Sequence, residues 1–274
     1  MLRSAVLRAC ASVRGWNGGV FAKRPEGSPH EFRGVTHPDL VLYEYEASPW
    51  CRRVRETLCV LDLEHTVRPC PRDTLRLEGA YGTASRYKAE VTQAGGRLLF
   101  PFLHDRTAGV ALNQSAAIVA HLWEHYGLDA ERPPLDGLLN GGLPKPLDFA
   151  ALVGPSALRL WAECGLMLAP SRPADAPLVL HGCEPDGGTR LLREKLCMLQ
   201  LAYRYKPRAA SPGAAIPHLE DPNTGWASFG ARDGLAYLEE AYQIGPCVGH
   251  LAGVPEPNLG DPGRTSWISS FLRP

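Results

Sequence analysis

The sequence has no net charge, no long apolar run and no paired-cysteine motif. Its 29 Lys and Arg residues balance 29 Asp and Glu residues, so electrostatics give no argument for a nucleic-acid or anionic membrane partner. No uninterrupted apolar segment approaches the roughly 18 residues of a membrane-spanning helix. The eight cysteines form no CxxC pair and no Cys/His cluster with zinc spacing. We therefore expect no membrane span, no nucleic-acid partner, no metal site and mostly free thiols.

Acidic residues are missing from the first 25 positions, which contain Arg3, Arg8, Arg14, Lys23 and Arg24. An Arg-rich, acid-free segment is typical of an organelle transit peptide, and a disordered basic tail is the plainer alternative. These residues by themselves do not separate a plastid from a mitochondrial address.

A duplicated segment predicts the architecture. Leu40–His65 matches Leu178–Tyr203 at an offset of 138 residues, with eleven of 26 positions identical. Phe100–Tyr126 matches Ile216–Tyr242 at an offset of 116. Because both blocks recur in the same order, we infer an internal duplication. The second copy lacks a counterpart of SRYKAEVTQAGG (85–96), a predicted short helix, so we expect it to have lost that helix.

Within the first copy, strands and helices are expected to alternate. Leu40–Tyr45 is a short apolar run typical of a buried strand, and Pro49–Leu63 has apolar residues at helical spacing. The predicted order is β-α-β-α-β-β-α with a parallel crossover, the order of the thioredoxin fold. The remaining predicted elements are a strand at Thr66–Cys70, hairpin strands at Leu98–Leu103 and Val110–Leu112, and a helix at Ser115–Tyr126.

Three motifs of the first copy carry a family resemblance. ASPWCRRVRETL (47–58), FPFL (100–103) and NQSAAIVAHLWEHYG (113–127) resemble the N-terminal domain of glutathione S-transferases, including organellar, chiefly plant and algal, proteins with two such domains in tandem. The resemblance implies an α/β protein of two tandem thioredoxin-like domains, the second shortened and degenerate. It also implies a location in the plastid (chloroplast) stroma, with the mitochondrial matrix as the alternative.

The expected organisation has five parts. They are a transit peptide or disordered segment at 1–37, a thioredoxin-like glutathione-binding domain at 38–128, a linker at 129–175 with room for a helix at Ala157–Met167, a degenerate thioredoxin-like domain at 176–244, and a Pro/Gly-rich tail at 245–274.

The start of the first predicted helix carries two candidate catalytic residues. Ser48 precedes Pro49 where free backbone N–H groups and the helix dipole favour an anion. The resemblance places Ser48 at the activating serine of tau and zeta transferases, whereas the plain alternative is an N-cap. Cys51 lies in the same turn, where a thiol pKa is typically lowered. It is either a monothiol nucleophile or a vestigial buried thiol.

Two further motifs are candidates for holding glutathione. Phe100–Pro101 matches the family's cis-proline, and the residue before that proline presents its backbone to the cysteinyl part of glutathione. Gln114 and Ser115 match the pair that holds the γ-glutamyl carboxylate at a helix N-terminus. A plain N-cap by Asn113 or Ser115 is the alternative.

The second copy does not keep these residues. Asp186 stands where the first copy has Ser48, and Gly230–Ala231 stands where it has Gln114–Ser115. An acid next to a thiolate is electrostatically unfavourable, so we expect this copy to be structural.

Other polar residues receive structural predictions. The arginines 52, 53 and 55 are expected to form a solvated helix face. The nine histidines show no clustering along the chain, and His121 and His125 are expected at the surface.

The leading functional interpretation is a glutathione-binding, transferase-like protein. Ser48 would activate the thiol of glutathione, the cosubstrate, for attack on an unknown small electrophile or a mixed disulfide. One alternative is a glutaredoxin-like thiol oxidoreductase that uses Cys51. The other is a non-catalytic thioredoxin-fold module that binds a protein partner through its second domain or its tail.

Overall fold

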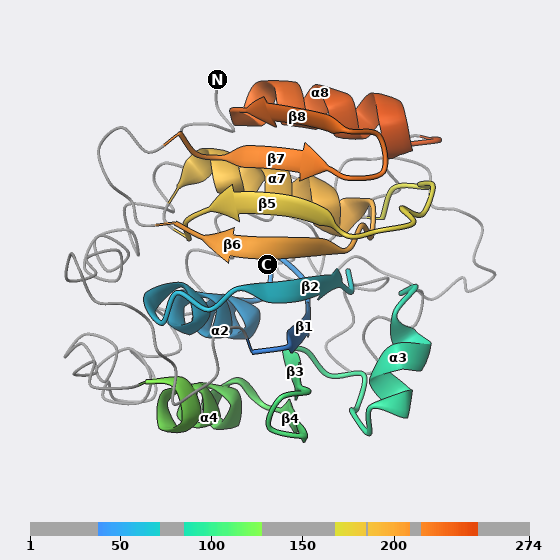
Figure 1. The fold of residues 1–274 in the computed structure, drawn as a ribbon. Coiled ribbons are helices and arrows are strands. Elements are labelled where there is room, and N and C mark those ends of the chain that lie inside the picture. Colours follow the sequence, from blue (N-terminus) through green and yellow to red (C-terminus); the bar gives the residue numbers. More distant parts are fainter. Residues whose placement is uncertain (1–37, 72–84, 128–167, 185, 209–214, 246–274) are drawn as a thin grey trace, which may run out of the picture.

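The computed structural model describes residues 38–71, 85–127, 168–184, 186–208 and 215–245. They form a mixed α/β arrangement around one eight-stranded sheet with the order β4-β3-β1-β2-β6-β5-β7-β8 (Figure 1). The expected transit peptide, the helix at 157–167 and most of the tail lie outside the described residues. No helix among the described residues is both long and apolar enough to cross a membrane.

The first half of the described chain follows the predicted order closely. The short α3 falls inside the segment that has no counterpart in the second copy. Its elements are β1 (Leu40–Glu44), α2 (Pro49–Val60), β2 (His65–Pro69), α3 (Lys88–Gln93), β3 (Phe102–Asp105), β4 (Val110–Asn113) and α4 (Ser115–Tyr126).

The second half has the same succession of elements apart from α3, and the described residues between β6 and β7 include no helix. Its elements are β5 (Leu178–Gly182), α7 (Gly187–Met198), β6 (Tyr203–Pro207), β7 (His218–Asp221), β8 (Trp226–Phe229) and α8 (Ala231–Tyr242).

The two halves meet at the centre of the sheet. β1 pairs with β2 in parallel, as the predicted crossover requires, and β5 pairs with β6 in the same way. β2 and β6 then pair antiparallel, with Thr66 opposite Arg204. The strands outward of β1 and of β5 are antiparallel hairpins. The hydrogen-bonded sheet is therefore continuous across the junction between the halves.

The side chains of the strands alternate between the two faces of the sheet, and apolar side chains on both faces pack against helices. On one face, Leu40 and Leu42 of β1 pack with α2 and α4 in a single apolar cluster, and β5 packs likewise with α7 and α8. On the opposite face, Val41 and Tyr43 pack with Val91 of α3.

Recurring Asp and Tyr residues anchor the last helix of each half. The Tyr126 hydroxyl donates to the Asp105 carboxylate at 2.6 Å, and the Tyr242 hydroxyl donates to Asp221 at 2.5 Å. His121 also contacts Asp105, at 2.8 Å, and is buried, so its expected surface position was wrong. Burial favours a raised pKa for Asp105, but the hydrogen bonds from Tyr126, the Ala108 N–H and His121 outweigh it and lower the pKa.

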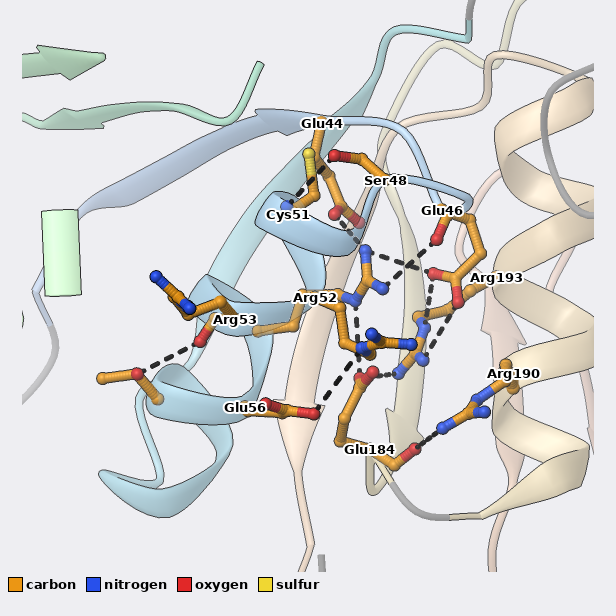
Figure 2. Close-up of polar contacts among 12 residues, drawn as sticks. Glu44, Glu46, Ser48, Cys51, Arg52, Arg53, Glu56, Glu184, Arg190 and Arg193 are labelled. Carbon is orange, nitrogen blue, oxygen red and sulfur yellow. Dashed lines mark hydrogen bonds and ion pairs between the residues drawn. The ribbon is translucent and has the colours of Figure 1, made fainter. Parts of the chain in front are cut away.

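The expectation of a solvated arginine face on α2 was also wrong. Arg52, Arg53 and Arg55 are all buried. The Arg52 side chain points toward the junction of the halves, whereas Arg53 points away from α7 (Figure 2), and Arg55 contacts Glu184 of the second half. The periodicity of α2 shows which positions are apolar, but the partner of its polar side comes from a segment over a hundred residues away.

The junction contains a buried ion cluster built largely from repeated residues. Arg193 of α7 makes a two-pronged contact with Glu46, at 3.0 and 3.3 Å, and reaches Glu184 at 2.6 Å. Arg55 of α2 contacts Glu46 at 3.3 Å and Glu184 at 3.4 Å, and it also pairs with Glu44. Each arginine thus contacts a glutamate from each half. The cluster explains why the repeat keeps Glu46 with Glu184 and Arg55 with Arg193.

Candidate functional site

The register of the sheet brings the predicted motifs to one end of the first half. Tyr43, near the end of β1, pairs with Phe102 at the start of β3, and Phe102 pairs with Asn113 at the end of β4. The turn into α2, the segment before β3 and the start of α4 therefore all leave the sheet at the same end.

Ser48 is the N-cap of α2, with backbone angles φ −70° and ψ 123°. Its Oγ accepts a hydrogen bond from the Cys51 backbone N–H at 3.2 Å, which satisfies one of the free donors of the first turn. Ser48 is only 1% exposed. The serine therefore has at least a capping role, and the position to which the resemblance assigns thiol activation is covered in this structure.

Cys51 is completely buried. It belongs to an apolar cluster with Tyr45, Ala47 and Cys197, against which Phe100 packs. Burial, and next the negative charge of Glu44, raise the pKa of the Cys51 thiol to about 12. The lowered pKa expected from its place in a first helical turn is therefore not found, because desolvation outweighs the helix terminus.

The Phe100–Pro101 peptide bond is cis, as the family resemblance implied, and so is Ile216–Pro217 in the second half. Asn113 holds the segment leading into this bond. Its side-chain amide donates to the Leu99 carbonyl at 2.8 Å, and its carbonyl accepts from the Arg97 N–H at 3.0 Å.

This role of Asn113 was missed in the sequence, where it was considered only as an N-cap. The signal available was its place directly before Gln114, but the partners at 97–99 follow only from the folded hairpin. In the second half, Phe229 occupies the corresponding position.

Gln114 takes the N-cap position of α4, and its side chain makes no capping hydrogen bond. Its φ is +76°, a region that residues other than glycine rarely adopt. The Gln114 side chain is exposed, and Ser115, the first helical residue, is buried. Neither Asn113 nor Ser115 is therefore the helix cap, and the first turn of α4 presents backbone donors beside an exposed amide.

The corresponding turns of the second half are self-contained. The Asp186 carboxylate accepts from both the backbone N–H and the hydroxyl of Thr189, at 2.5 and 2.7 Å. Gly230 replaces Gln114 with nearly the same backbone angle, φ +89°. Asp186 thus satisfies the helix start internally, and no side chain stands at the Gln114 position.

A further polar group was not foreseen. The side chains of His181, His218 and Glu220 lie close enough to hold a metal ion. They were missed because the two histidines are far apart in the sequence and meet only through the pairing of β5 with β7.

Comparison with known proteins agrees with this geometry for the first half. Residues 42–133 match the family model described as the glutathione S-transferase N-terminal domain. No curated protein matches the sequence. The matched segment begins within β1, continues past α4, and contains the glutathione-site candidates Ser48, Cys51, Phe100, Pro101, Gln114 and Ser115. The match supports a thioredoxin-fold domain similar to the N-terminal domain of glutathione S-transferases in the first half, and the second half lies outside the matched segment.

Proposed function

We propose that the protein is a glutathione-binding, transferase-like protein of two tandem thioredoxin-like domains, whose ligand site lies in the first domain. The tandem reading is supported by the repeated succession of elements on either side of the β2–β6 junction. The second domain serves as the structural partner, because its helix start is satisfied internally by Asp186.

The observation that carries the proposal is the conformation of Gln114. A non-glycine residue in the left-handed region costs about 1–2 kcal/mol, and the equivalent position of the second half is Gly230. The first half therefore keeps a side chain at a position where glycine would remove the backbone strain. Such an outlier supports a functional role, and an exposed amide beside the N–H groups of a helix start suits a carboxylate.

Glutathione would lie across the three converging segments. Its γ-glutamyl carboxylate would bind at Gln114 and Ser115, and its cysteinyl backbone would pair with the main chain at Phe100, next to Pro101. The thiol would then point toward Ser48. A serine hydroxyl can donate a hydrogen bond to a thiolate, which lowers the pKa of the thiol and prepares it to attack an electrophile or a mixed disulfide.

A non-catalytic module is the second candidate. The burial of Ser48 favours it, because a covered hydroxyl does not meet a bound thiol. The glutaredoxin-like alternative is weaker, since Cys51 is buried with a pKa raised to about 12 and the reactive species is the thiolate.

Calorimetric titration of the full chain with reduced glutathione tests the binding site. We expect a dissociation constant below about 1 mM, near −4 kcal/mol, and a loss of at least tenfold in Gln114→Ala. Gln93→Ala, at the exposed end of α3, is the matched control and should bind like the parent. Equal affinities for the parent and Gln114→Ala, or no binding at millimolar glutathione, would refute the site.

Ser48→Ala separates binding from activation. Under the transferase proposal this variant binds glutathione but conjugates a model electrophile at least tenfold more slowly than the parent. Conjugation at the parent rate would remove Ser48 from the mechanism. Binding without conjugation by the parent itself would support the module.

We further propose the plastid stroma as the location, with the mitochondrial matrix as the alternative. The basic composition of residues 1–25 supports an organelle location, and the resemblance to organellar tandem-domain proteins favours the plastid over the mitochondrion. A fluorescent protein fused behind residues 1–37 should be imported into plastids in plant cells, and a diffuse cytosolic signal would contradict the proposal.

A further inference from the structure

His181, His218 and Glu220 come together on one face of the second half of the sheet. His181 in β5 lies directly opposite His218 in β7, and Glu220 is two residues further along β7, on the same face. Their ligand atoms all lie within 4.8 Å of one another. His181 Nε2 is 2.9 Å and His218 Nδ1 is 3.3 Å from the same oxygen of Glu220.

In the first half, the equivalent face of the sheet carries apolar side chains and is covered by a helix. By the repeat, His181 corresponds to Tyr43 and His218 to Phe102. These two aromatic rings lie 5.5 Å apart and are buried under α3. The described residues of the second half include no helix in that place. The histidines and Glu220 are 12%, 19% and 40% exposed, so an ion in solvent can reach them.

We propose that His181, His218 and Glu220 form a binding site for a divalent transition-metal ion of the zinc type. Two imidazoles and one carboxylate are among the ligand sets that zinc uses when water completes a tetrahedron. Zinc–ligand bonds of about 2.0–2.2 Å place neighbouring ligand atoms about 3.3–3.6 Å apart. The two distances to Glu220 are close to that spacing before any adjustment. Adjacent paired strands supply the ligands, so little conformational entropy is lost on binding.

Neighbouring side chains determine which nitrogen of His181 carries the proton and how the His218 ring is oriented. Arg208 Nη2 lies 3.0 Å from His181 Nδ1, and a guanidinium only donates hydrogen bonds. His181 Nδ1 therefore accepts, and the ring proton sits on Nε2, which donates to Glu220. Phe229 stacks on His218 with ring centroids 4.2 Å apart and fixes the plane of that ring.

Zinc binding would require one rearrangement. The Nε2 proton of His181 must move to Nδ1 so that Nε2 can bind the metal, and Nδ1–H then no longer accepts from Arg208. Arg208 is exposed, so its side chain can turn into solvent. Arg208 is thus a competitor of the metal for His181.

The primary experiment measures zinc binding to the full chain by calorimetry, with metal analysis after equilibrium dialysis. We expect one zinc per chain and a loss of affinity of more than about tenfold in His181→Asn and His218→Asn, since even changes to outer-shell partners cost about 10–100-fold. Glu220→Gln keeps the size of the side chain and should also weaken binding. Circular dichroism should show that each variant is folded.

His125→Asn is the matched control. His125 and His121 form another close imidazole pair, with centroids 4.1 Å apart, but they lie on α4 in the first half. Zinc affinity should be unchanged in this variant. Absence of zinc binding by the parent, or parent affinity in both His181→Asn and His218→Asn, would overturn the proposal.

Arg208→Gln tests the ligand arrangement itself. Removing the competitor should tighten zinc binding, because a glutamine carbonyl can accept from the Nδ1–H that forms. Weaker binding in Arg208→Gln would contradict the assignment of Nε2 as the His181 ligand atom. Tetrahedral cobalt absorption in the parent, lost in His218→Asn, gives a readout independent of affinity.

Discussion

Arg193 lies in α7 of the second half, yet its guanidinium contacts both carboxylate oxygens of Glu46, which follows β1 in the first half, at 3.0 and 3.3 Å. Both side chains are about 1% exposed. The contact crosses the junction beside the β2–β6 pairing and joins the halves through charge as well as through backbone hydrogen bonds.

Replacing Arg193 should destabilise both halves together. Arg193→Met leaves Glu46 and Glu184 buried with one fewer cation, and breaking a buried pair from one side typically costs about 3–5 kcal/mol. We expect the free energy of unfolding, measured in denaturant, to fall by that amount. Both halves should unfold together, in one transition at a lower denaturant concentration than in the parent.

Arg106→Gln is the control for that change. Arg106 pairs with Asp39 at 3.6 Å, but both side chains are exposed, so the loss should be at most about 1 kcal/mol. Equal losses in the two variants would mean that the buried cluster contributes no more than a surface pair.

His65 should make the protein sensitive to mild acid. Burial lowers the pKa of His65 from 6.5 to about 4, while its Nδ1 contact with the Leu63 carbonyl opposes that shift. Because the pKa of His65 is lower in the folded protein than in the unfolded chain, its protonation does not reduce the free energy of unfolding above pH 6.5. The free energy of unfolding falls as pH drops from 6.5 toward 4, because between these two pKa values His65 is protonated mainly in the unfolded chain. The shift corresponds to about 3 kcal/mol.

His65→Gln is the variant that isolates this effect. Its free energy of unfolding should change less between pH 6.5 and 4 than that of the parent. Burial raises the pKa of Glu44 to about 7, and Glu44 acts in the opposite sense over part of this range. The measured quantity is therefore the difference between parent and variant. Parallel pH profiles would contradict the role of His65.

Gln114→Gly should separate stability from binding. Glycine adopts φ +76° without steric cost, so the variant should be as stable as the parent or up to about 1–2 kcal/mol more stable. Under the proposed function it should lose glutathione affinity at least tenfold. Thermal unfolding and calorimetry on the same sample check both parts. A stable variant that binds like the parent would show that the side chain has no role in the site.

Cys51 should resist alkylation in the native protein. Its thiol is fully buried and its pKa is raised to about 12 by burial, so little thiolate forms and none is accessible. Mass spectrometry after iodoacetamide treatment at pH 8 should find Cys51 unmodified until denaturant is added. Rapid native labelling would revive the oxidoreductase alternative.

Much of the fold was predictable because it depends on local patterns. The helix at Ser115–Tyr126 was predicted to the residue, since it begins directly after a strand and carries a clear apolar stripe. The short α3 lies in the segment that the two repeat offsets leave without a counterpart, and the described residues of the second half include no such helix. The cis bond before Pro101 followed from resemblance alone, as no local pattern distinguishes it.

The burial of polar residues was predicted poorly. Arg55 looks like part of a solvated face on an isolated helix, but in the folded protein it lies against Glu46 and against Glu184 of the second half. For Cys51 the sequence left open a nucleophile with a lowered pKa or a vestigial buried thiol, and the apolar cluster with Phe100 decides for burial. In both cases the deciding partner lies far away in the sequence.

The sequence by itself determined the repeated order of strands and helices and the positions of the motifs that resemble those of glutathione S-transferases, because these depend on periodicity and on residues close in the chain. Only the tertiary structure decided that the halves share one sheet, that Arg193 meets Glu46, and that His181 meets His218. Strand register and helix packing fix such contacts, and both arise when segments distant in sequence bury their surfaces against each other.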